Sequence, residues 1–215
     1  MNILLTGGAG YIGSVVVQEL LKHNFNVIII DNLKEGNIEA VLPDAIFFQG
    51  DFSDEDLLVK IFKQYKIDMV FHFAAETTIE FSITDPEKYF DNNITKGLKL
   101  LSIMKQFKCN KFIFSSTAAI FGNPKYTPID ELHPKVPINA YGESKLIFEN
   151  ILEWYHRSYG LKYNAFRYFN AAGATDLLGE SHKNESHLIP MIMKSIIHNK
   201  QINALKVFGN NYPTK

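Results

Sequence analysis

Cysteine is almost absent from this chain, which limits the ways in which its fold can be stabilised. The 215 residues include one cysteine, Cys109, so no disulfide can form within the chain. A lone cysteine is usually a small buried hydrophobe, and proteins with few cysteines are typical of a reducing compartment. The fold must therefore depend on a hydrophobic core, which the length and the 46% hydrophobic content allow.

An excess of charge and long apolar runs are also missing. Twenty-two basic residues face 23 acidic ones, and without a basic patch we expect neither nucleic acid nor a membrane as partner. No run approaches the roughly 20 apolar residues of a membrane span, and the chain opens without a basic and apolar leader, which favours the cytoplasm. The seven histidines show no HExxH or CxxC pairing, so we expect no metal site.

The chain does contain a regular alternation of buried strands and amphipathic helices. Apolar runs predict strands near residues 2–6, 26–31, 45–51, 69–73, 111–115 and 163–168. Helical spacing and end signals predict helices near 11–23, after an N-cap at Ser53, near 86–107 and near 140–159, before Gly160. This order predicts an α/β fold, a Rossmann-type doubly wound parallel sheet with helices on both faces.

Four glycines, Gly7, Gly8, Gly10 and Gly13, lie between the first predicted strand and the first predicted helix. Gly7 would permit a tight turn, Gly10 would let the backbone approach a pyrophosphate, and Gly13 would let helix and strand pack closely. Free N–H groups at a helix start favour an anion. A glycine-rich turn alone can be only a turn, but the flanking strand and helix favour a phosphate site.

Asp31 ends the second predicted strand, 18 residues after Gly13. At this position a carboxylate can accept hydrogen bonds from both hydroxyls of an adenosine ribose, and it would repel a 2′-phosphate. The alternative is an aspartate that only caps a turn. Together with the glycines, Asp31 favours NAD over NADP as cofactor.

Tyr141 and Lys145 are four residues apart on a predicted helix, so both can reach one cleft. A tyrosine titrates near pH 10 in water, and the Lys145 ammonium together with an oxidised nicotinamide ring would lower its pKa toward the range of acid–base catalysis. A Tyr–Lys pair at this spacing is usually a surface pair. The hydroxyls of residues 115–117, after a strand at the same sheet edge, favour a catalytic interpretation.

Several motifs in order resemble one enzyme family. They are TGGAGYIG, Asp31-Asn32, HFAA (72–75), Asp91-Asn92-Asn93, FSSTAAIFG (114–122), YGESK (141–145) and RYFNAAGA (167–174). Together they resemble the extended short-chain dehydrogenase/reductase family and, within it, the enzymes that invert C4 of a UDP-hexose. The resemblance covers the whole chain.

The resemblance implies a reaction and roles for three residues. An NAD would take a hydride from C4 of the UDP-sugar, and the resulting 4-keto sugar would turn over and receive the hydride on its other face, interconverting UDP-glucose and UDP-galactose. Tyr141 would be the base and then the acid, Thr117 would polarise the O4 hydroxyl, and Lys145 would hold the nicotinamide ribose and tune Tyr141. The family also implies a homodimer through the helices near 86–107 and 140–159, and Leu98, Leu101, Ile147, Ile151 and Trp154 are apolar enough for that interface.

The family also implies two sets of binding positions. Those for the cofactor are Gly7, Gly10, Tyr11, Ile12, Gly13, Asp31, Asn32, Asp51, Phe52, Phe73, Ala74, Ala75, Asn92, Tyr141, Lys145 and Phe169. Those for the sugar nucleotide are Thr117, Tyr141, Asn170, His187, Leu188 and Phe208. We expect residues 1–175 to form the NAD-binding domain and residues 176–215 to begin a substrate-binding domain.

Two segments depart from related enzymes. Sugar-nucleotide dehydratases follow the catalytic Thr with an Asp-Glu pair, whereas Ala118-Ala119 follow Thr117 here, so dehydration is not expected. The segment 76–82, ETTIEFS, differs from the usual epimerase pattern, which leaves substrate handling open there.

The last residues, VFGNNYPTK (207–215), match the stretch that leads epimerases into the segment with the diphosphate-binding arginine. We therefore expect a carboxyl-terminally truncated form, a fragment or a natural product, whose turnover lies at least about a thousandfold below that of a complete relative. Another NAD-dependent sugar-nucleotide enzyme, such as a uronate epimerase or a reductase, and a non-catalytic NAD-binding remnant are the alternatives. The sequence leaves open which UDP-hexoses, N-acetylated ones included, are accepted.

Overall fold

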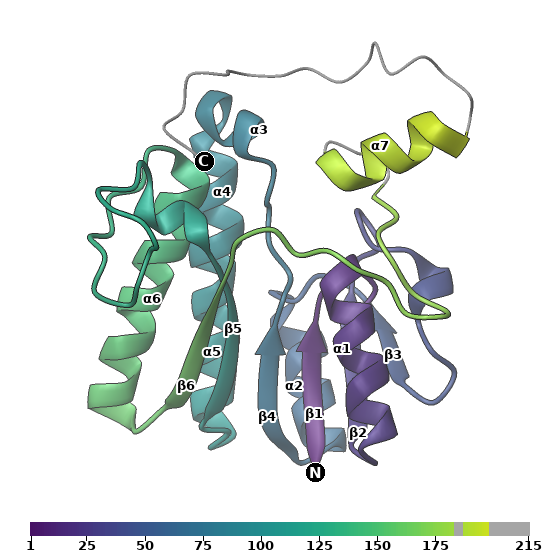
Figure 1. Ribbon diagram of the computed structural model, residues 1–215. Helices are drawn as coiled ribbons and strands as arrows, with labels where there is room; N and C mark the ends of the chain where they lie inside the picture. The colour runs from purple at the N-terminus through teal and green to yellow at the C-terminus, as the bar shows by residue number, and fades with distance from the viewer. Residues whose placement is uncertain (183–186, 198–215) are drawn as a thin grey trace.

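The computed structural model describes residues 1–182 and 187–197, and its centre is one parallel sheet (Figure 1). The six strands are β1 (Asn2–Thr6), β2 (Asn26–Asp31), β3 (Ile46–Gln49), β4 (Ile67–His72), β5 (Lys111–Thr117) and β6 (Lys162–Tyr168). Their order is β3-β2-β1-β4-β5-β6, and each neighbouring pair is parallel. The chain order reverses between β1 and β4, where ligands bind beyond the carboxyl ends of the strands in such sheets. The predicted doubly wound parallel sheet is confirmed.

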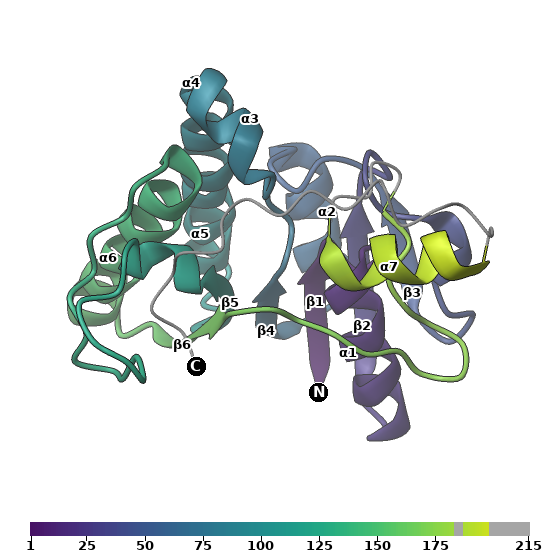
Figure 2. The ribbon, with the colours of Figure 1, turned by 45° about the horizontal axis from the view of Figure 1, so that its top comes forward.

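Helices cover both faces of this sheet. They are α1 (Tyr11–Lys22), α2 (Glu55–Gln64), α3 (Ile79–Thr84), α4 (Pro86–Phe90), α5 (Lys96–Gln106), α6 (Ala140–Tyr159) and α7 (Leu188–Ile197), with short helical segments η1 (Ile38–Ala40), η2 (Asp91–Thr95) and η3 (Ala118–Phe121). The main core joins Leu4, Ile28 and Phe112 of the sheet to side chains of α2, α5 and α6. On the opposite face, Leu5 and Ile29 pack with Val17 of α1. Figure 2 shows α5 and α6 side by side on their common face.

The predicted helix near residues 86–107 is one helical run whose middle is irregular. The segment η2 (Asp91–Thr95) is π-helical and joins α4 to α5. A single π turn inserted in a helix often marks a functional site. Asn93, within this segment, turns its side chain toward Glu76 and Ser144.

The predicted N-cap of α2 is wrong by one residue. Asp54, not Ser53, caps the helix, because its carboxylate accepts a hydrogen bond from Leu57 N at 3.0 Å. The Ser53 hydroxyl is engaged elsewhere, since it donates to Asp51 Oδ1 at 2.7 Å. A nearby carboxylate therefore competes with the helix end for the serine.

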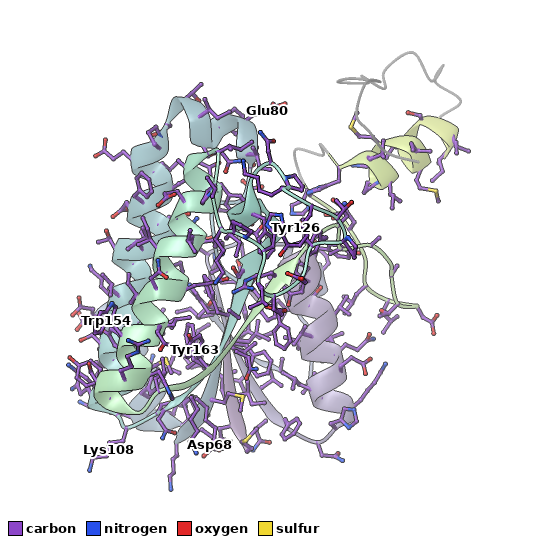
Figure 3. All side chains as sticks on the ribbon, turned by 60° about the vertical axis from the view of Figure 1, so that its left-hand side comes forward. Asp68, Glu80, Lys108, Tyr126, Trp154 and Tyr163 are labelled. Carbon is purple, nitrogen blue, oxygen red and sulfur yellow. The ribbon has the colours of Figure 1, made fainter. Side chains whose placement is uncertain are left out.

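The residues predicted for a dimer interface divide between core and surface. The prediction is wrong for Leu101, because this side chain is buried in the core against the sheet. Trp154 is 65% exposed on the outer side of α6 (Figure 3). Leu98 of α5 is also exposed. Among residues 1–182 and 187–197, no helix is long and apolar enough to cross a membrane.

Candidate functional site

The glycine-rich loop after β1 has backbone contacts that only glycine allows. Gly7 has φ +75°, and a Cβ at this position would lie 2.6 Å from Ala74 N. A Cβ on Gly13 would lie 2.1 Å from Gly7 O, so the loop folds back directly onto α1. A Cβ on Gly10 would meet Gly7 O at an ordinary 3.4 Å, so packing within the described chain does not require glycine there. A ligand that approaches the backbone closely would require it.

The start of α1 faces the same space. Gly10 is its N-cap, and in the described part of the chain no side chain caps the first turn, which includes Tyr11, Ile12 and Gly13. The N–H groups of a first helical turn have no partner within the helix and bind anions well. The loop and the helix start thus have the geometry of a phosphate cradle, in which Gly10 is the glycine whose Cβ position is not crowded by the described chain.

Asp31 has the turn-capping role that the sequence left open, and its ribose-binding role stays a prediction. Its carboxylate is 8% exposed and accepts hydrogen bonds from Ala9 N at 3.0 Å and from Leu33 N at 2.9 Å. It therefore caps the turn after β2 and also ties that turn to the glycine-rich loop. Each carboxylate oxygen has a second lone pair for a further donor, such as a ribose hydroxyl. Asn32 lies beside it and accepts from Lys34 N at 3.0 Å.

Asp51 and Phe52, after β3, lie in different surroundings. Burial would raise the pKa of Asp51, but hydrogen bonds from Lys96 and Ser53 outweigh burial and lower it. The Lys96 Nζ–Asp51 Oδ2 distance is 2.8 Å. The Phe52 side chain is buried, with its ring centroid 4.9 Å from that of His72. Any contact of Phe52 with a ligand would therefore use its backbone.

The HFAA motif closes the loop against β1. The N–H groups of Phe73 and Ala74 both donate to Thr6 O, at 3.0 and 3.1 Å, and Ala75 follows, half-buried. His72 is buried, and its Nδ1 lies 2.7 Å from Thr6 Oγ1. Burial first, and then the charge of Lys145, lowers the pKa of His72 to about 3. The imidazole is therefore neutral at physiological pH and holds two strands together.

A second set of groups lies at the ends of β5 and α6. Lys145 is buried, and its Nζ donates to Ser115 O at 2.8 Å and lies 4.9 Å from the centroid of the Phe114 ring. Thr117 is also buried, and its side chain hydrogen-bonds to Tyr141. The structure thus brings together the three predicted catalytic side chains.

Burial and one hydrogen bond set the pKa of Tyr141 in this structure. Burial raises the pKa of Tyr141, and the hydrogen bond with Thr117 opposes that rise without cancelling it. Burial also lowers the pKa of Lys145 to about 7, so this amine carries only part of its charge near neutrality. Burial therefore dominates the pKa of Tyr141 in this structure, and its predicted lowering by Lys145 together with an oxidised nicotinamide ring stays a prediction.

The half-buried Asn92 is predicted to contact a cofactor, but its neighbour Asn93 makes the connections in this region. Asn92 Nδ2 donates to Asn93 Oδ1 at 3.2 Å. Asn93 accepts from Glu76 N at 2.9 Å and donates to Ser144 Oγ at 3.0 Å. It thereby links the loop after β4 to α6. The Glu76 carboxylate in turn binds Lys34 at 2.5 Å and Lys88 at 3.0 Å.

The predicted sugar-side residues come from three places. Asn170 and Phe169 follow β6 and are exposed, and the Phe169 ring centroid lies 6.5 Å from that of Phe121. His187 and Leu188 are exposed at the start of α7, which Figure 1 shows above the carboxyl end of the sheet. Phe208 lies outside the described residues.

Sequence reasoning missed an ion pair between the buried Glu149 and the partly buried Arg167, next to the predicted catalytic side chains. Arg167 Nε and Nη2 donate to the two carboxylate oxygens of Glu149 at 3.0 and 2.9 Å, and Ser116 Oγ donates to Glu149 Oε1 at 2.6 Å. Glu149 follows Lys145 by four residues, so helical spacing could have indicated it. Arg167 could not be found this way, because its partner lies on another element.

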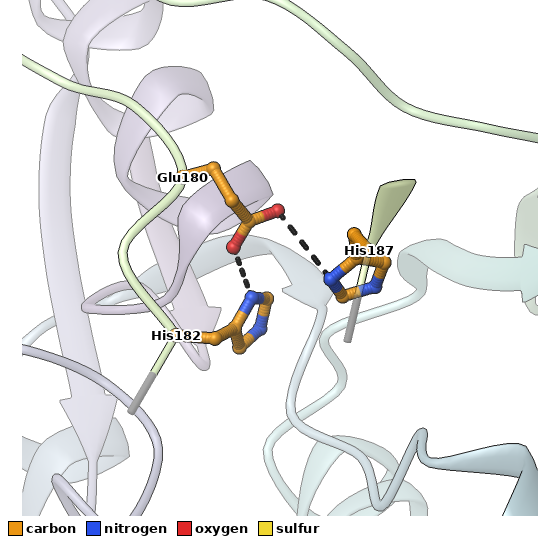
Figure 4. Close-up of side chains that lie close together, drawn as sticks. All are labelled: Glu180, His182 and His187. Carbon is orange, nitrogen blue, oxygen red and sulfur yellow. Dashed lines mark ion pairs between the residues drawn. The ribbon is translucent and has the colours of Figure 1, made fainter. Parts of the chain in front are cut away.

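A cavity of about 350 Å³ lies beside the start of α1, lined by Gly10, Tyr11, Glu35, Glu180 and His182 among others. Within the described part of the chain, Glu180, His182 and His187 form one group whose potential metal-donor atoms lie within 4.8 Å of one another. Figure 4 shows Glu180 between the two imidazoles, paired with His182 and 3.9 Å from His187 Nδ1. Carboxylate and imidazole are ligands that zinc takes. This juxtaposition follows no spacing that the sequence analysis tested.

Comparisons with known proteins agree with this geometry. The model of the NAD dependent epimerase/dehydratase family matches residues 3–214. The chain is 47% identical over 217 residues to the UDP-glucose 4-epimerase of Lacticaseibacillus casei, in a match that covers 100% of this chain and 65% of the relative. It is 46% identical to the UDP-glucose 4-epimerase of Lactobacillus helveticus, with the same coverage. The chain spans about 65% of the length of these curated relatives.

Two crystal structures share the fold. UDP-glucose 4-epimerase from Brucella ovis in complex with NAD has a TM-score of 0.93 at 40% identity, over 99% of this chain and 65% of that chain. UDP-glucose 4-epimerase from Bifidobacterium longum in complex with NAD+ and UDP has a TM-score of 0.92 at 35% identity, over 100% of this chain and 67% of that chain.

Proposed function

The chain belongs to the NAD dependent epimerase/dehydratase family, and from this membership we propose that it is the NAD-binding and catalytic part of an epimerase that interconverts UDP-glucose and UDP-galactose. The single observation that carries this proposal is the meeting of Thr117, Tyr141 and Lys145 at the sheet end that also holds the glycine-rich loop. The activity of the curated relatives and the ligands of the two crystal structures support the sugar and the cofactor.

The residues present fit a dinucleotide. Gly10 leaves the backbone bare where a pyrophosphate would lie, and the Asp31 carboxylate has lone pairs for the ribose. When bound, NAD supplies a hydride acceptor and donor. Gly7, Gly10, Tyr11, Ile12 and Gly13 would hold the phosphates, with Asp31 and Asn32 on the adenosine side.

The chain's own residues would move the proton of the sugar O4 hydroxyl. Tyr141 would take that proton during oxidation and return it during reduction, and Thr117 would orient the O4 hydroxyl through its side-chain oxygen. With its pKa raised by burial, the Tyr141 phenol holds its proton firmly, so its role as base requires positive charge nearby. The Lys145 ammonium, when charged, would supply part of it.

The direct test uses the 215-residue chain itself. NAD binding is measured by calorimetry, and conversion of UDP-glucose is followed by chromatography of the sugar products. We expect submicromolar-to-micromolar NAD affinity and formation of UDP-galactose, at a low rate if sugar contacts lie in the part of the relatives that this chain does not span. Fusing the chain to the remaining segment of the Lacticaseibacillus casei relative should raise the rate. NAD binding without UDP-galactose formation in that fusion would contradict the proposal.

Product analysis also separates the rival readings. A uronate epimerase would convert UDP-glucuronate instead, and a reductase would consume NADH in proportion to product. A non-catalytic NAD-binding protein would yield no product from any UDP-sugar, in the chain or in the fusion. UDP-N-acetylglucosamine in the same assay reports whether N-acetylated hexoses are accepted.

A homodimer through the outer faces of α5 and α6 is part of the proposal. The exposed Trp154 and the partly buried Ile147 and Ile151 of α6 support such a contact. Light scattering should give twice the chain mass, and Trp154→Glu should halve it; a monomer at high micromolar concentration would contradict it. The cytoplasm as compartment, and the domain boundary after residue 175, stay predictions.

A further inference from the structure

Strand β5 and helix α6 are joined by three contacts close to the proposed catalytic centre, two between side chains and one from the Lys145 side chain to the Ser115 backbone carbonyl. The residues on α6 are spaced by four, so they lie on one face of the helix. Their partners are three consecutive residues at the end of β5. The pairs are Thr117 with Tyr141, Ser115 with Lys145 and Ser116 with Glu149.

The Ser116–Glu149 pair differs from the other two because neither residue is expected to touch a ligand. Glu149 has a side chain only 7% exposed, and its two oxygens bind Arg167 in a bidentate pair. Lys135 Nζ adds a contact to Glu149 Oε2 at 3.4 Å. Burial would raise the pKa of Glu149, but the hydrogen bonds from Arg167 and Ser116 outweigh burial and lower it. Glu149 is therefore a buried carboxylate with a full set of partners.

Arg167 fixes this carboxylate relative to the sheet. Arg167 lies directly opposite Ser116 in the β5–β6 register. Its guanidinium also binds Glu131 at 2.9 Å and lies 5.6 Å from the centroid of the Phe121 ring. Because Glu131 belongs to the segment that leads into α6, one guanidinium holds β5, β6, α6 and this segment together.

We propose that Glu149 and Arg167 are positioning residues for the proposed epimerase reaction, which hold Ser116 against α6 so that the Thr117 and Tyr141 hydroxyls face each other. This inference rests on the proposed function for its catalytic meaning. Its structural content is independent of turnover, because it concerns the contact between two side chains. Ser116 lies between Ser115, which binds Lys145, and Thr117, so a shift of this residue moves both neighbouring contacts.

The experiment must separate positioning from stability. Removing one member of a buried ion pair leaves an unpaired charge, whereas replacing both members by apolar residues is often neutral or stabilising. The variant is therefore the double substitution Glu149→Met/Arg167→Met. Its matched control is Glu153→Met/Arg157→Met, which removes an Arg–Glu pair at 2.7 Å on the exposed side of the same helix.

The readout is the ¹³Cζ NMR signal of Tyr141 in chain labelled at its ten tyrosines and loaded with NAD. Tyr141→Phe assigns the signal, and Thr117→Val gives the position that it takes without the threonine hydroxyl. We expect the signal of Glu149→Met/Arg167→Met to move to the Thr117→Val position. The control pair should leave it at the wild-type position. If Glu149 and Arg167 only stabilise the fold, the double variant should have a lower melting temperature but an unchanged Tyr141 signal.

Kinetics give a second readout wherever the wild-type chain or its fusion turns over. We expect kcat to fall about 10- to 100-fold, the size of a small misplacement of reacting groups. KM for UDP-glucose should stay within about threefold, since the network touches no predicted sugar contact other than through Thr117 and Tyr141.

A folded double variant whose Tyr141 signal stays at the wild-type position overturns the inference. If the double variant does not fold, Ser116→Ala, which keeps the ion pair, decides in the same way by movement or constancy of the signal. Absence of turnover in the wild-type fusion would overturn the proposed function. The Tyr141 NMR signal would then still test whether Glu149 and Arg167 position the Thr117–Tyr141 contact.

Discussion

The two halves of the sheet form their parts of the site by different physical means. On the β1–β2 side, the glycine-rich loop is shaped by backbone contacts so close that a Cβ on Gly13 would lie 2.1 Å from Gly7 O. On the β5–β6 side, the site is shaped by side chains, above all by the pair of the buried Glu149 and the partly buried Arg167. The first half depends on the absence of side chains, and the second depends on partners that come from separate elements.

This difference predicts how each half responds to substitution. In the β1–β2 half, where backbone contacts shape the glycine-rich loop, a single added methyl group obstructs the loop, and the obstruction is local. In the other half the loss of one group disturbs several contacts, because buried polar networks act as a unit. The following variants test that contrast, in order of decreasing expected effect.

Tyr141→Phe, in the β5–β6 half, should have the largest effect. It removes the hydroxyl that is proposed to carry the proton, and general acid–base groups contribute about 10²- to 10⁴-fold to rate. We expect UDP-galactose formation by the fusion protein to fall by that factor while calorimetric NAD affinity changes little. Tyr159→Phe, an exposed residue at the end of the same helix, is the control. Retention of full turnover by Tyr141→Phe would show that another group moves the proton.

Gly13→Ala, in the β1–β2 half, should have the next largest effect. The new methyl group would displace Gly7 O from α1, at a cost of about 1–3 kcal/mol in unfolding free energy, and the distorted loop should weaken NAD binding about 100-fold. Gly160→Ala is the control, because Gly160 also has a constrained backbone, φ +71°, but no atom lies near its Cβ position. It should lose stability in a urea titration and keep its NAD affinity. Equal NAD affinities of the two variants would contradict the steric argument.

Asp31→Ala should weaken NAD binding by about 1–3 kcal/mol, as expected when hydrogen bonds to a carboxylate are lost. Because Asp31 also accepts from Ala9 N, the glycine-rich loop should become more mobile, seen as faster amide exchange at Ala9. Asp31→Asn should keep one backbone acceptor and bind NADP relatively better, since the repulsion of a 2′-phosphate is removed. Calorimetry in which wild-type protein prefers NADP, or binds both equally, would overturn the predicted cofactor choice.

His72 lies between the two halves and should give the smallest effect. It bonds to Thr6 of β1 and packs 6.2 Å, between ring centroids, from Phe114 of β5. Its pKa in the folded protein, about 3, is below the unfolded value, so the unfolded chain binds the extra proton between about pH 6.5 and 3. Stability is therefore lost as pH falls through this window, by at most about 1.4 kcal/mol per pH unit from this residue.

His72→Gln removes this titration. Urea titrations at pH 7, 6 and 5 should show a shallower fall of unfolding free energy in the variant than in the wild-type chain. His23→Gln, at an exposed histidine after α1, should keep the wild-type slope. Parallel slopes for wild type and His72→Gln would mean that the imidazole is not held neutral.

The same contrast explains what the sequence could predict. The strands, the end of α6 at Gly160 and the loop of Gly7–Gly13 depend on neighbours in the chain, so local patterns indicated them. The Tyr141–Lys145 pair could be found because both lie on one helix. Arg167 could not, because its role depends on the register that places it opposite Ser116. The inward direction of Leu101 and the raised pKa of Tyr141 depend on burial, which no spacing in the sequence reveals.

The contacts between β5 and α6 also constrain chain length. An inserted residue turns the rest of an α-helix by about 100°, and a one-residue slip in a strand moves every later side chain to the other face. The helix and the strand repeat with different periods, and their contacts are in register at Tyr141, Lys145 and Glu149. A single-residue insertion or deletion between Tyr141 and Glu149 would shift these contacts out of register. A change of length in the exposed segment around Pro128 would leave α6 and β5 in register.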